Sequence, residues 1–278
     1  MKKVIFTILL SLLFAFSLSA REYEVYGPQG GLDMEITLPE GFNPETDHCP
    51  MVILMHGVFS SKDLNPILAL ADGLAQAGIA SIRFDFDGHG KSEGRLQDMT
   101  IEKEIADAMA ILEYVKALPY VSKIGFLGHS QGGVIASMTA GRLAAAGSDV
   151  PVAMALLAPG SIIKYACKIG KFFSASFDPE DPPEYIRCFV IKKLGREYLL
   201  ETQNLEIYET SAAYKGKVCL LHGSNDHTVP IWCSECYKTI YGDRAELTII
   251  DGENHRFVLR RDQVVAKTVE FFMTAFEL

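Results

Sequence analysis

The segment Gly128–Gly132 reads G-H-S-Q-G and contains the strongest candidate for a nucleophile, Ser130. It follows the apolar, strand-like run Lys123–Leu127 and precedes a helix-like stretch that starts at about Gly132. In this context the pattern predicts a nucleophile elbow, a strained strand-to-helix turn that exposes the serine hydroxyl between small residues. The alternative interpretation is a glycine-rich packing turn without catalytic function.

A serine hydroxyl becomes nucleophilic only beside a base, and the base is oriented by a carboxylate. Where such an elbow occurs, the chain order is serine, acid, histidine. Asp226 and His255 follow in that order, each just beyond an apolar, strand-like run. We therefore predict Asp226 as the orienting acid and His255 as the general base and acid. Asp251 and Glu253 remain alternatives for the acid.

The negative charge that develops on the substrate carbonyl oxygen requires two fixed N–H donors. One is expected from the residue after the nucleophile, which is Gln131, and one from the loop after an early central strand. That loop begins with His56 directly after the apolar run Pro50–Met55, and we predict the backbone of Val58 as its donor. His56 itself is predicted to be a structural residue at the strand end rather than a catalyst.

No sequence pattern indicates a metal, a phosphate-binding loop or another cofactor. The remaining histidines flank the predicted catalytic segments or lie in a tight turn, without the spacing of metal ligands. The glycine-rich segment Gly88–Ser92 lacks the spacing of a phosphate-binding loop. No cofactor is therefore expected.

Composition and charge exclude several classes of protein. The 278 residues are 49% apolar and 22% charged, which is typical of a globular chain with a sizeable core. The formal net charge of −9 argues against a nucleic-acid partner or an anionic membrane surface, since both attract basic proteins.

Strand-like and helix-like segments alternate along most of the chain, which predicts a mostly parallel sheet with helices on both faces. Asn65 and Pro66 are the predicted cap and first residue of the first of these helices. Near the N-terminus, Glu22–Tyr26 and Leu32–Leu38 suit an antiparallel edge ribbon. The predicted strands of the main sheet are Pro50–Met55, Ile79–Phe84, Lys123–Leu127, Val152–Leu157, Lys217–Leu221 and Ala245–Ile250.

The alternation stops between Ser161 and about Glu209. This stretch contains aromatic residues, two cysteines and the turn-rich segment Asp178–Pro183, with short helical stretches and no predicted strand. An insertion of this kind commonly forms a lid or one wall of a substrate pocket. The predicted organisation is a single domain, residues 21–278, with an insertion at about 161–209.

The first twenty residues are typical of a secretory signal peptide. Two lysines precede the apolar run Val4–Leu18, and small residues follow before Arg21, so cleavage is expected near Ser19 or Ala20. The run is shorter than the about 20 apolar residues that cross a bilayer. Export to the periplasm or the medium is therefore expected.

Six cysteines follow this leader, and an oxidising compartment would permit disulfides among them. Sequence alone does not choose between their pairings. Cys219 lies in an apolar run and is predicted to be a buried thiol. Cys233 and Cys236 have redox-motif spacing, but they occur late in the chain, so a structural bridge or two free thiols is favoured. The six are Cys49, Cys167, Cys188, Cys219, Cys233 and Cys236.

Taken together, these motifs resemble the α/β-hydrolase fold and, more narrowly, the bacterial cinnamoyl (feruloyl) esterases, over nearly the whole mature chain. The resemblance implies a secreted serine esterase that releases ferulic, coumaric or caffeic acid from plant cell-wall polysaccharide through an acyl-enzyme. Ser130, Asp226 and His255 match the triad, and Val58 and Gln131 match the oxyanion donors. The segments that carry the resemblance are His56-Gly57, Arg83–Gly94, Gly128–Gly133, Leu157–Pro159, His222–Asp226 and Gly252–His255.

The resemblance also concerns substrate contacts within the insertion. Relatives use polar groups there to bind the phenolic hydroxyl; Tyr198 matches one such position, whereas Ala166 stands where an aspartate is expected. Two other functions remain open. The aromatic insertion would also suit a lipase or short-chain acyl esterase, and an exported thiol-disulfide or binding protein would use Cys233 and Cys236. Oligomeric state is not predicted.

Overall fold

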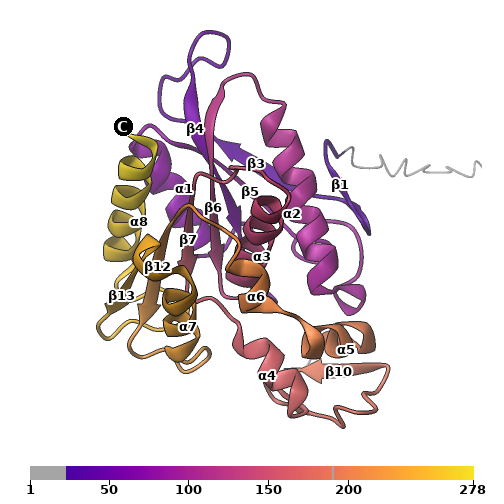
Figure 1. Cartoon of the computed structure of the whole chain (residues 1–278). Coiled ribbons are helices and arrows are strands. Elements are labelled where there is room, and N and C mark those ends of the chain that lie inside the picture. Colours follow the sequence, from indigo (N-terminus) through magenta and orange to yellow (C-terminus); the bar gives the residue numbers. More distant parts are fainter. Residues whose placement is uncertain (1–22, 190) are drawn as a thin grey trace, which may run out of the picture.

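The core of the protein is a seven-stranded sheet. The computed structural model describes residues 23–189 and 191–278, and the count refers to these residues. Neighbouring strands are parallel except at one edge, where β3 runs antiparallel to β5. The predicted mostly parallel α/β sheet is confirmed (Figure 1). In spatial order the strands are β13 (Ala245–Ile250), β12 (Lys217–Gly223), β7 (Ala153–Leu157), β6 (Val121–His129), β4 (Cys49–Met55), β5 (Ala80–Phe84) and β3 (Met34–Thr37).

Strand β4 shows why the central strands are apolar along their whole length. All seven of its residues are buried, and its side chains alternate between two cores. Val52 and Leu54 face one core, while Ile53 and Met55 face the other. A parallel strand covered on both faces lacks a solvent side, so it has no polar alternation.

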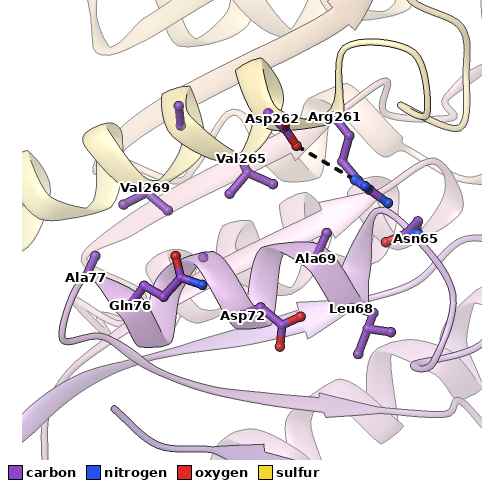
Figure 2. A pocket seen from close by; sticks show the side chains of 12 residues that line it. Asn65, Leu68, Ala69, Asp72, Gln76, Ala77, Arg261, Asp262, Val265 and Val269 are labelled. Atoms are coloured by element: carbon purple, nitrogen blue, oxygen red, sulfur yellow. Dashed lines mark ion pairs between the residues drawn. The ribbon is translucent and has the colours of Figure 1, made fainter. Parts of the chain in front are cut away.

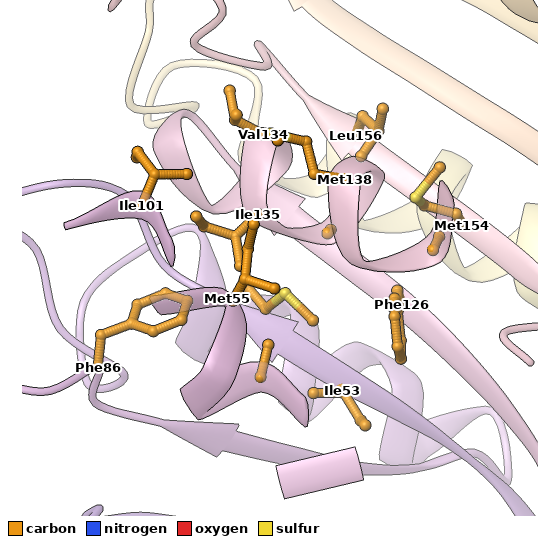
Figure 3. Close-up of a cluster of buried hydrophobic side chains, with 14 of the residues drawn as sticks. Ile53, Met55, Phe86, Ile101, Phe126, Val134, Ile135, Met138, Met154 and Leu156 are labelled. Atoms are coloured by element: carbon orange, nitrogen blue, oxygen red, sulfur yellow. The ribbon is translucent and has the colours of Figure 1, made fainter. Parts of the chain in front are cut away.

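Five long helices in the described part of the chain cover the two faces of the sheet (Figure 1). The helices α1 and α8 pack together over one face, and α2, α3 and α7 cover the other. Figure 3 shows the core under α2 and α3, where Ile135 and Met138 of α3 lie over Phe126 of β6. The helices are α1 (Ile67–Gln76), α2 (Ile101–Lys116), α3 (Gln131–Ala145), α7 (Trp232–Tyr241) and α8 (Arg261–Phe276).

The first of these helices begins differently from the prediction. Helix α1 begins at Ile67, with Pro66 at the cap position and no side-chain cap, so the prediction of Asn65 as the cap is wrong. The backbone takes over this function, since the Leu68 N–H donates to the carbonyl of Leu64. Such a shift of one residue is common at helix ends, where local sequence signals are weakest.

Between β7 and β12 the chain leaves the sheet and forms the insertion, which lies beyond the lower end of the sheet in Figure 1. The prediction that it lacks strands is wrong, because two short hairpins occur there. Their strands are two to four residues long and include pairs such as Arg187 opposite Lys193, so they show no apolar alternation to detect. The elements are α4 (Ile162–Lys168), β8 (Lys171–Phe172), β9 (Ala175–Ser176), β10 (Tyr185–Cys188), β11 (Lys192–Gly195), α5 (Arg196–Asn204) and α6 (Ile207–Ser211).

The N-terminal segments also differ in part from the prediction. The segment Leu32–Leu38 supplies β3, the antiparallel edge strand, which pairs with β5. Its first residue, Leu32, donates its N–H to the Val25 carbonyl at 2.9 Å, but in the described residues β3 itself forms no ladder with the preceding segment. Instead β1 (Tyr26–Gly27) and β2 (Gly30–Gly31) form a small hairpin of their own. Two short 3₁₀ helices, Leu96–Asp98 and Gly242–Arg244, complete the regular structure. The predicted leader, residues 1–20, lies outside the described residues.

All six cysteines are free thiols in the structure. Cys219 lies on β12 and is buried, as predicted for its apolar run. A search of the described residues finds no helix that is both long and apolar enough to span a membrane.

Candidate active site

Ser130 occupies the sharp turn between β6 and α3. Its backbone angles are φ 57° and ψ −123°, a left-handed conformation that is unusual for a residue with a side chain. The turn is held because the Ser130 N–H donates to the Leu157 carbonyl at 2.9 Å. Gly132 is required on the other side of the turn, since a Cβ there would lie 2.3 Å from the Met55 carbonyl oxygen. The sequence thus folds locally into the geometry that a nucleophile elbow needs.

The structure brings Ser130, Asp226 and His255 into one hydrogen-bonded line. His255 Nδ1 lies 2.7 Å from Asp226 Oδ2, and His255 Nε2 lies 2.9 Å from Ser130 Oγ. Because an ionised carboxylate only accepts, Nδ1 carries the proton and Nε2 is left to accept the serine hydroxyl proton. These residues follow the carboxyl ends of β6, β12 and β13, which lie at the same edge of the parallel sheet.

The carboxylate of Asp226 is buried, and both of its oxygens have hydrogen-bond partners. Its Oδ1 accepts the backbone N–H groups of Thr228 and Val229, each at 2.8 Å, and its Oδ2 lies 3.3 Å from His222 Nε2. Burial alone would raise the pKa of Asp226, but the hydrogen bonds from His222 and His255 outweigh burial and hold that pKa well below its usual value. Asp226 is therefore ionised at neutral pH.

The two alternative acids do not reach the histidine. Glu253 is buried and turns back onto its own loop, where its carboxylate accepts the N–H groups of Asn254 at 2.7 Å and Leu259 at 3.2 Å. Asp251 is exposed and accepts a hydrogen bond from Ser224 Oγ at 3.3 Å. In the described part of the chain, His255 therefore contacts Asp226 and neither of these carboxylates.

The two predicted oxyanion donors, Val58 and Gln131, line the same cavity as Ser130. Within residues 23–189 and 191–278, neither backbone N–H donates to another protein group. The loop that carries Val58 passes so close to the nucleophile that a Cβ on Gly57 would lie 2.9 Å from Ser130 Cβ. Both N–H groups are thus available for a charged oxygen beside the serine.

His56 holds the Val58 peptide in position. The Phe86 N–H donates to His56 Nε2 at 3.2 Å, so the proton lies on Nδ1, which donates to the Gly57 carbonyl at 2.8 Å. The N–H and C=O of a trans peptide point in opposite directions, so fixing the Gly57 carbonyl also fixes the Val58 N–H. Burial lowers the pKa of His56, which keeps the ring neutral and able to accept and donate at once. The structural role predicted for His56 agrees with this geometry.

His89 supports the same loop one residue further along. Its Nε2 accepts the Phe59 N–H at 3.3 Å, and its Nδ1 lies 3.2 Å from the carbonyl oxygen of Asp87. Burial lowers the pKa of His89 to about 3, so this ring is neutral too. Sequence reasoning placed His89 in a tight turn without recognising this contact.

A buried chain of hydrogen bonds stands behind Gln131. Its side-chain amide donates to Glu104 Oε2 at 2.7 Å, and its Oε1 accepts the Tyr198 hydroxyl proton at 2.7 Å. Burial raises the pKa of Glu104 to about 8, although the hydrogen bond from Gln131 opposes this. Tyr198, which the resemblance places among the substrate contacts, is 0% exposed, does not line this cavity and supports Gln131.

Sequence reasoning missed Glu104, although a signal was present. Ile101, Ile105 and Ala108 follow the helical spacing of a buried stripe, and Glu104 lies on that stripe. A carboxyl group on the buried face of a helix must find a polar partner inside the protein. The pattern therefore pointed to a buried polar contact, but not to its partner.

His129, which precedes the nucleophile, was also missed. Its Nε2 donates to the carbonyl oxygen of His255 at 2.8 Å, and the two rings lie 4.9 Å apart. Burial and the neighbouring His255 lower the pKa of His129 to about 3, so it is a neutral donor. This contact fixes the backbone of the loop that carries the base.

Two cavities meet at the nucleophile. The first, of about 250 Å³, is mostly apolar, and the insertion supplies five of its twelve lining residues, Ala166 among them. The second, of about 300 Å³, is also lined by Ser130 and includes His255. The complete lining of the first cavity is Val58, Ser130, Gln131, Gly160, Ile162, Ile163, Ala166, Phe172, Phe173, His227, Thr228 and Val229.

A larger hollow, of about 680 Å³, lies away from this site between α1 and α8 (Figure 2). The two helices pack closely beneath it, since a Cβ on Gly73 would lie 2.3 Å from Val265. None of the triad residues lines it. The hollow is therefore a crevice between packed helices and not part of the catalytic geometry.

Among the described residues there is no group of three or more histidine, cysteine, aspartate or glutamate side chains that could hold a metal ion. Cys233 is buried, and burial raises the pKa of its thiol to about 11. Redox cysteines instead have lowered pKa values, so Cys233 has the character of a structural thiol.

Comparisons with known proteins point in the same direction. The Hydrolase_4 family model, described as serine aminopeptidase, S33, matches residues 46–177. The chain superposes on Est1E from Butyrivibrio proteoclasticus with ferulic acid bound, with a TM-score of 0.83 and 27% identity, over 89% of this chain and 96% of that one. A monoacylglycerol lipase from Paleococcus ferrophilus shares the fold at 17% identity, with a TM-score of 0.64 over 88% of this chain and 99% of that one.

A curated relative is similar over a shorter stretch. A mitochondrial palmitoyl-protein thioesterase from Bos taurus is 31% identical over 84 residues, which is 30% of this chain. The match spans about a quarter of the relative, 26% of its length. The sheet topology and these likenesses show that the chain has the α/β-hydrolase fold and resembles the feruloyl esterases.

Proposed function

We propose that the protein is an esterase that cleaves carboxylic esters through an acyl-enzyme on Ser130. The observation that carries this proposal is the continuous hydrogen-bonded line from Ser130 Oγ through the His255 ring to the Asp226 carboxylate. This arrangement serves nucleophilic acyl transfer, because the base accepts the hydroxyl proton and the carboxylate stabilises the imidazolium that forms.

The reaction proceeds in two halves. Ser130 Oγ attacks the ester carbonyl while His255 Nε2 takes its proton, and the backbone N–H groups of Val58 and Gln131 bind the oxyanion. The tetrahedral intermediate then expels the alcohol, whose oxygen receives the proton from His255. Water attacks the resulting acyl-enzyme with His255 as the base, and the acid leaves as Ser130 recovers its proton.

For the acyl group we propose a hydroxycinnamoyl unit such as feruloyl. The first cavity is mostly apolar, and its volume of about 250 Å³ lies just below the roughly 300–1,000 Å³ of pockets for drug-sized ligands. A compact aromatic acid suits such a space better than a long alkyl chain. The likeness to Est1E, whose structure contains bound ferulic acid, supports the same class.

The test is hydrolysis of methyl ferulate, nitrophenyl butyrate and nitrophenyl palmitate by the purified protein, beside a Ser130→Ala variant. The proposal predicts the highest kcat/KM for the ferulate and loss of all turnover in the variant. Residual turnover by Ser130→Ala at the wild-type rate would overturn the assignment of the nucleophile. Turnover of the butyrate alone would retain the esterase and remove the hydroxycinnamoyl class.

A lipase is the second candidate, because apolar side chains are exposed near the site. Phe173 is 47% exposed and Phe189 is 57% exposed, and both line the cavity that contains His255. An exposed apolar rim is what a lipid aggregate would contact. A rise in kcat/KM from butyrate to palmitate would favour this candidate over the hydroxycinnamoyl esterase.

We further propose that the protein is exported and acts on esters of plant cell-wall polysaccharide. The support is the leader pattern of residues 1–20 and the resemblance to feruloyl esterases. Expression of the full chain, followed by cell fractionation and N-terminal sequencing, tests the first part. Export predicts a mature N-terminus at Ala20 or Arg21 outside the cytoplasm, whereas a cytoplasmic protein that begins at Met1 would contradict it.

A further inference from the structure

The second cavity beside Ser130 is a distinct space with its own lining. It has a volume of about 300 Å³ and shares Val58, Ser130, Phe173 and Thr228 with the first cavity. The two cavities therefore adjoin at the nucleophile. An ester that reacts at Ser130 has an acyl part and an alcohol part to place in the space around this residue.

The catalytic residues show which part goes where. His255 lines the second cavity and not the first, whereas Gln131 lines the first and not the second. His255 must protonate the oxygen of the departing alcohol, so that oxygen lies on the His255 side. The alcohol therefore occupies the second cavity, and the acyl group occupies the first.

Three phenylalanine rings form one wall of this alcohol cavity. The ring centres of Phe59 and Phe173 lie 5.6 Å apart, those of Phe173 and Phe189 lie 5.3 Å apart, and those of Phe59 and Phe189 lie 6.0 Å apart. They come from the loop after β4, the β8–β9 turn and the β10–β11 turn. The two from the insertion are about half exposed, so part of each side chain is accessible.

The backbone at these residues is unusual. Phe59, Phe173 and Phe189 have φ angles of 60°, 49° and 55°, in the left-handed region that bulky side chains rarely adopt. Such strained conformations concentrate at binding and catalytic sites, where the surrounding structure enforces them. Three separate loops thus adopt an unfavourable conformation that brings the rings together at the same place.

A cation lies at the edge of the same cavity. Arg256 follows the catalytic histidine, is exposed, and forms no side-chain hydrogen bond or ion pair within the described ranges. Its guanidinium is therefore available to hydroxyl or anionic groups on an occupant. The lining combines flat apolar surfaces with a donor at the rim.

We propose that the second cavity is a subsite for the alcohol part of the ester, and that it selects alcohols with a ring whose apolar face stacks on Phe59, Phe173 and Phe189. Both an aromatic ring and the C–H face of a sugar ring have this chemistry. The inference rests on the proposed esterase function, because it uses His255 as the acid that protonates the leaving oxygen.

The test compares three butyrate esters that share one acyl group: methyl butyrate, benzyl butyrate and methyl 6-O-butyryl-glucopyranoside. Phe189→Ala is the informative variant, because Phe189 is exposed and lines the second cavity but not the first. We expect kcat/KM to fall about five- to ten-fold for a ring-bearing ester, the size of one aromatic contact, and less than two-fold for the methyl ester. The benzyl and glucosyl arms separate an aryl from a sugar occupant.

A second measurement distinguishes this role from a general structural effect. The alcohol departs before the acyl-enzyme is hydrolysed, so Phe189→Ala should leave the deacylation rate of the common butyryl-enzyme unchanged. Ile162→Ala is the matched control, since Ile162 lines the first cavity alone and its replacement should affect all three esters equally.

Equal losses for all three esters in Phe189→Ala, or a slower deacylation, would overturn the proposal. Turnover that survives in Ser130→Ala would instead overturn the esterase function itself, so the two failures are distinguishable.

Discussion

The carboxyl group of Glu104 lies 2.7 Å from the side-chain amide of Gln131, whose backbone N–H is one of the two predicted oxyanion donors. The oxygen of the same amide accepts a hydrogen bond from the Tyr198 hydroxyl group. Both the nitrogen and the oxygen of the Gln131 side chain therefore have buried partners. A buried acid and a buried phenol thus fix the residue directly after the nucleophile.

The raised pKa of Glu104 has a consequence for stability. Its folded-state pKa of about 8 lies above its ordinary value of 4.5, so between these pH values the folded protein binds a proton that the unfolded chain has released. Stability must therefore decrease as the pH rises from about 4.5 to about 8. At about 1.4 kcal/mol per pKa unit, this loss is at most about 5 kcal/mol.

Replacement of Glu104 by Gln should remove this dependence while it keeps an acceptor for Gln131. We expect the free energy of unfolding of Glu104→Gln, relative to that of the wild type, to increase steadily between pH 5 and pH 8. Urea unfolding at several pH values measures the difference, and the titration of other carboxyl groups cancels in it. Parallel profiles for the two proteins would show that Glu104 does not titrate in this range.

Asp226→Asn tests the orienting acid. An amide cannot stabilise the imidazolium of His255, and it allows the ring to adopt the wrong tautomer, so kcat should fall about 10³- to 10⁴-fold. Steady-state hydrolysis of a nitrophenyl ester is the measurement, with Asp251→Asn as the control because its carboxylate is exposed and contacts Ser224. A ten-fold loss or less in Asp226→Asn would mean that another group orients the histidine.

His129→Phe tests the contact that holds the loop of the base. The substitution keeps an aromatic ring but removes the N–H that donates to the His255 carbonyl at 2.8 Å. We expect kcat to fall about ten-fold with little change in KM, and the free energy of unfolding to fall by about 1–2 kcal/mol. Kinetics together with thermal unfolding measure both effects, and an unchanged kcat would contradict a positioning role.

Gly57→Ala tests how closely the oxyanion loop must approach the nucleophile. The added methyl group would meet Ser130 Cβ at 2.9 Å and the His129 carbonyl at 3.3 Å, so loop and serine must move apart. Displacements of this kind can lower kcat/KM by about 10- to 100-fold. The rate should fall in protein whose circular dichroism matches the wild type, whereas a rate within two-fold of wild type would show that the loop tolerates the shift.

Ser130 and the central strands could be predicted because their signals are local. A G-x-S-x-G turn between a strand and a helix constrains a few neighbouring residues, and strand β4 is apolar throughout because both faces are covered. The order of Asp226 and His255 along the chain, each at a strand end, was enough to identify candidates for the acid and the base. The short hairpins of the insertion lacked any comparable signal.

The choice of partners depended on the tertiary structure. From the sequence alone, Glu253 remained an alternative to Asp226 as the acid. Only the folded loop shows that the Glu253 carboxylate accepts backbone N–H groups of its own loop. Tyr198 and Glu104 lie 67 and 27 positions from Gln131, and the fold places both behind it, away from the substrate cavity. Periodicity indicates that a side chain is buried. Packing between distant segments decides which groups that side chain contacts. The same packing brings Phe59, Phe173 and Phe189 together in the cavity beside the nucleophile.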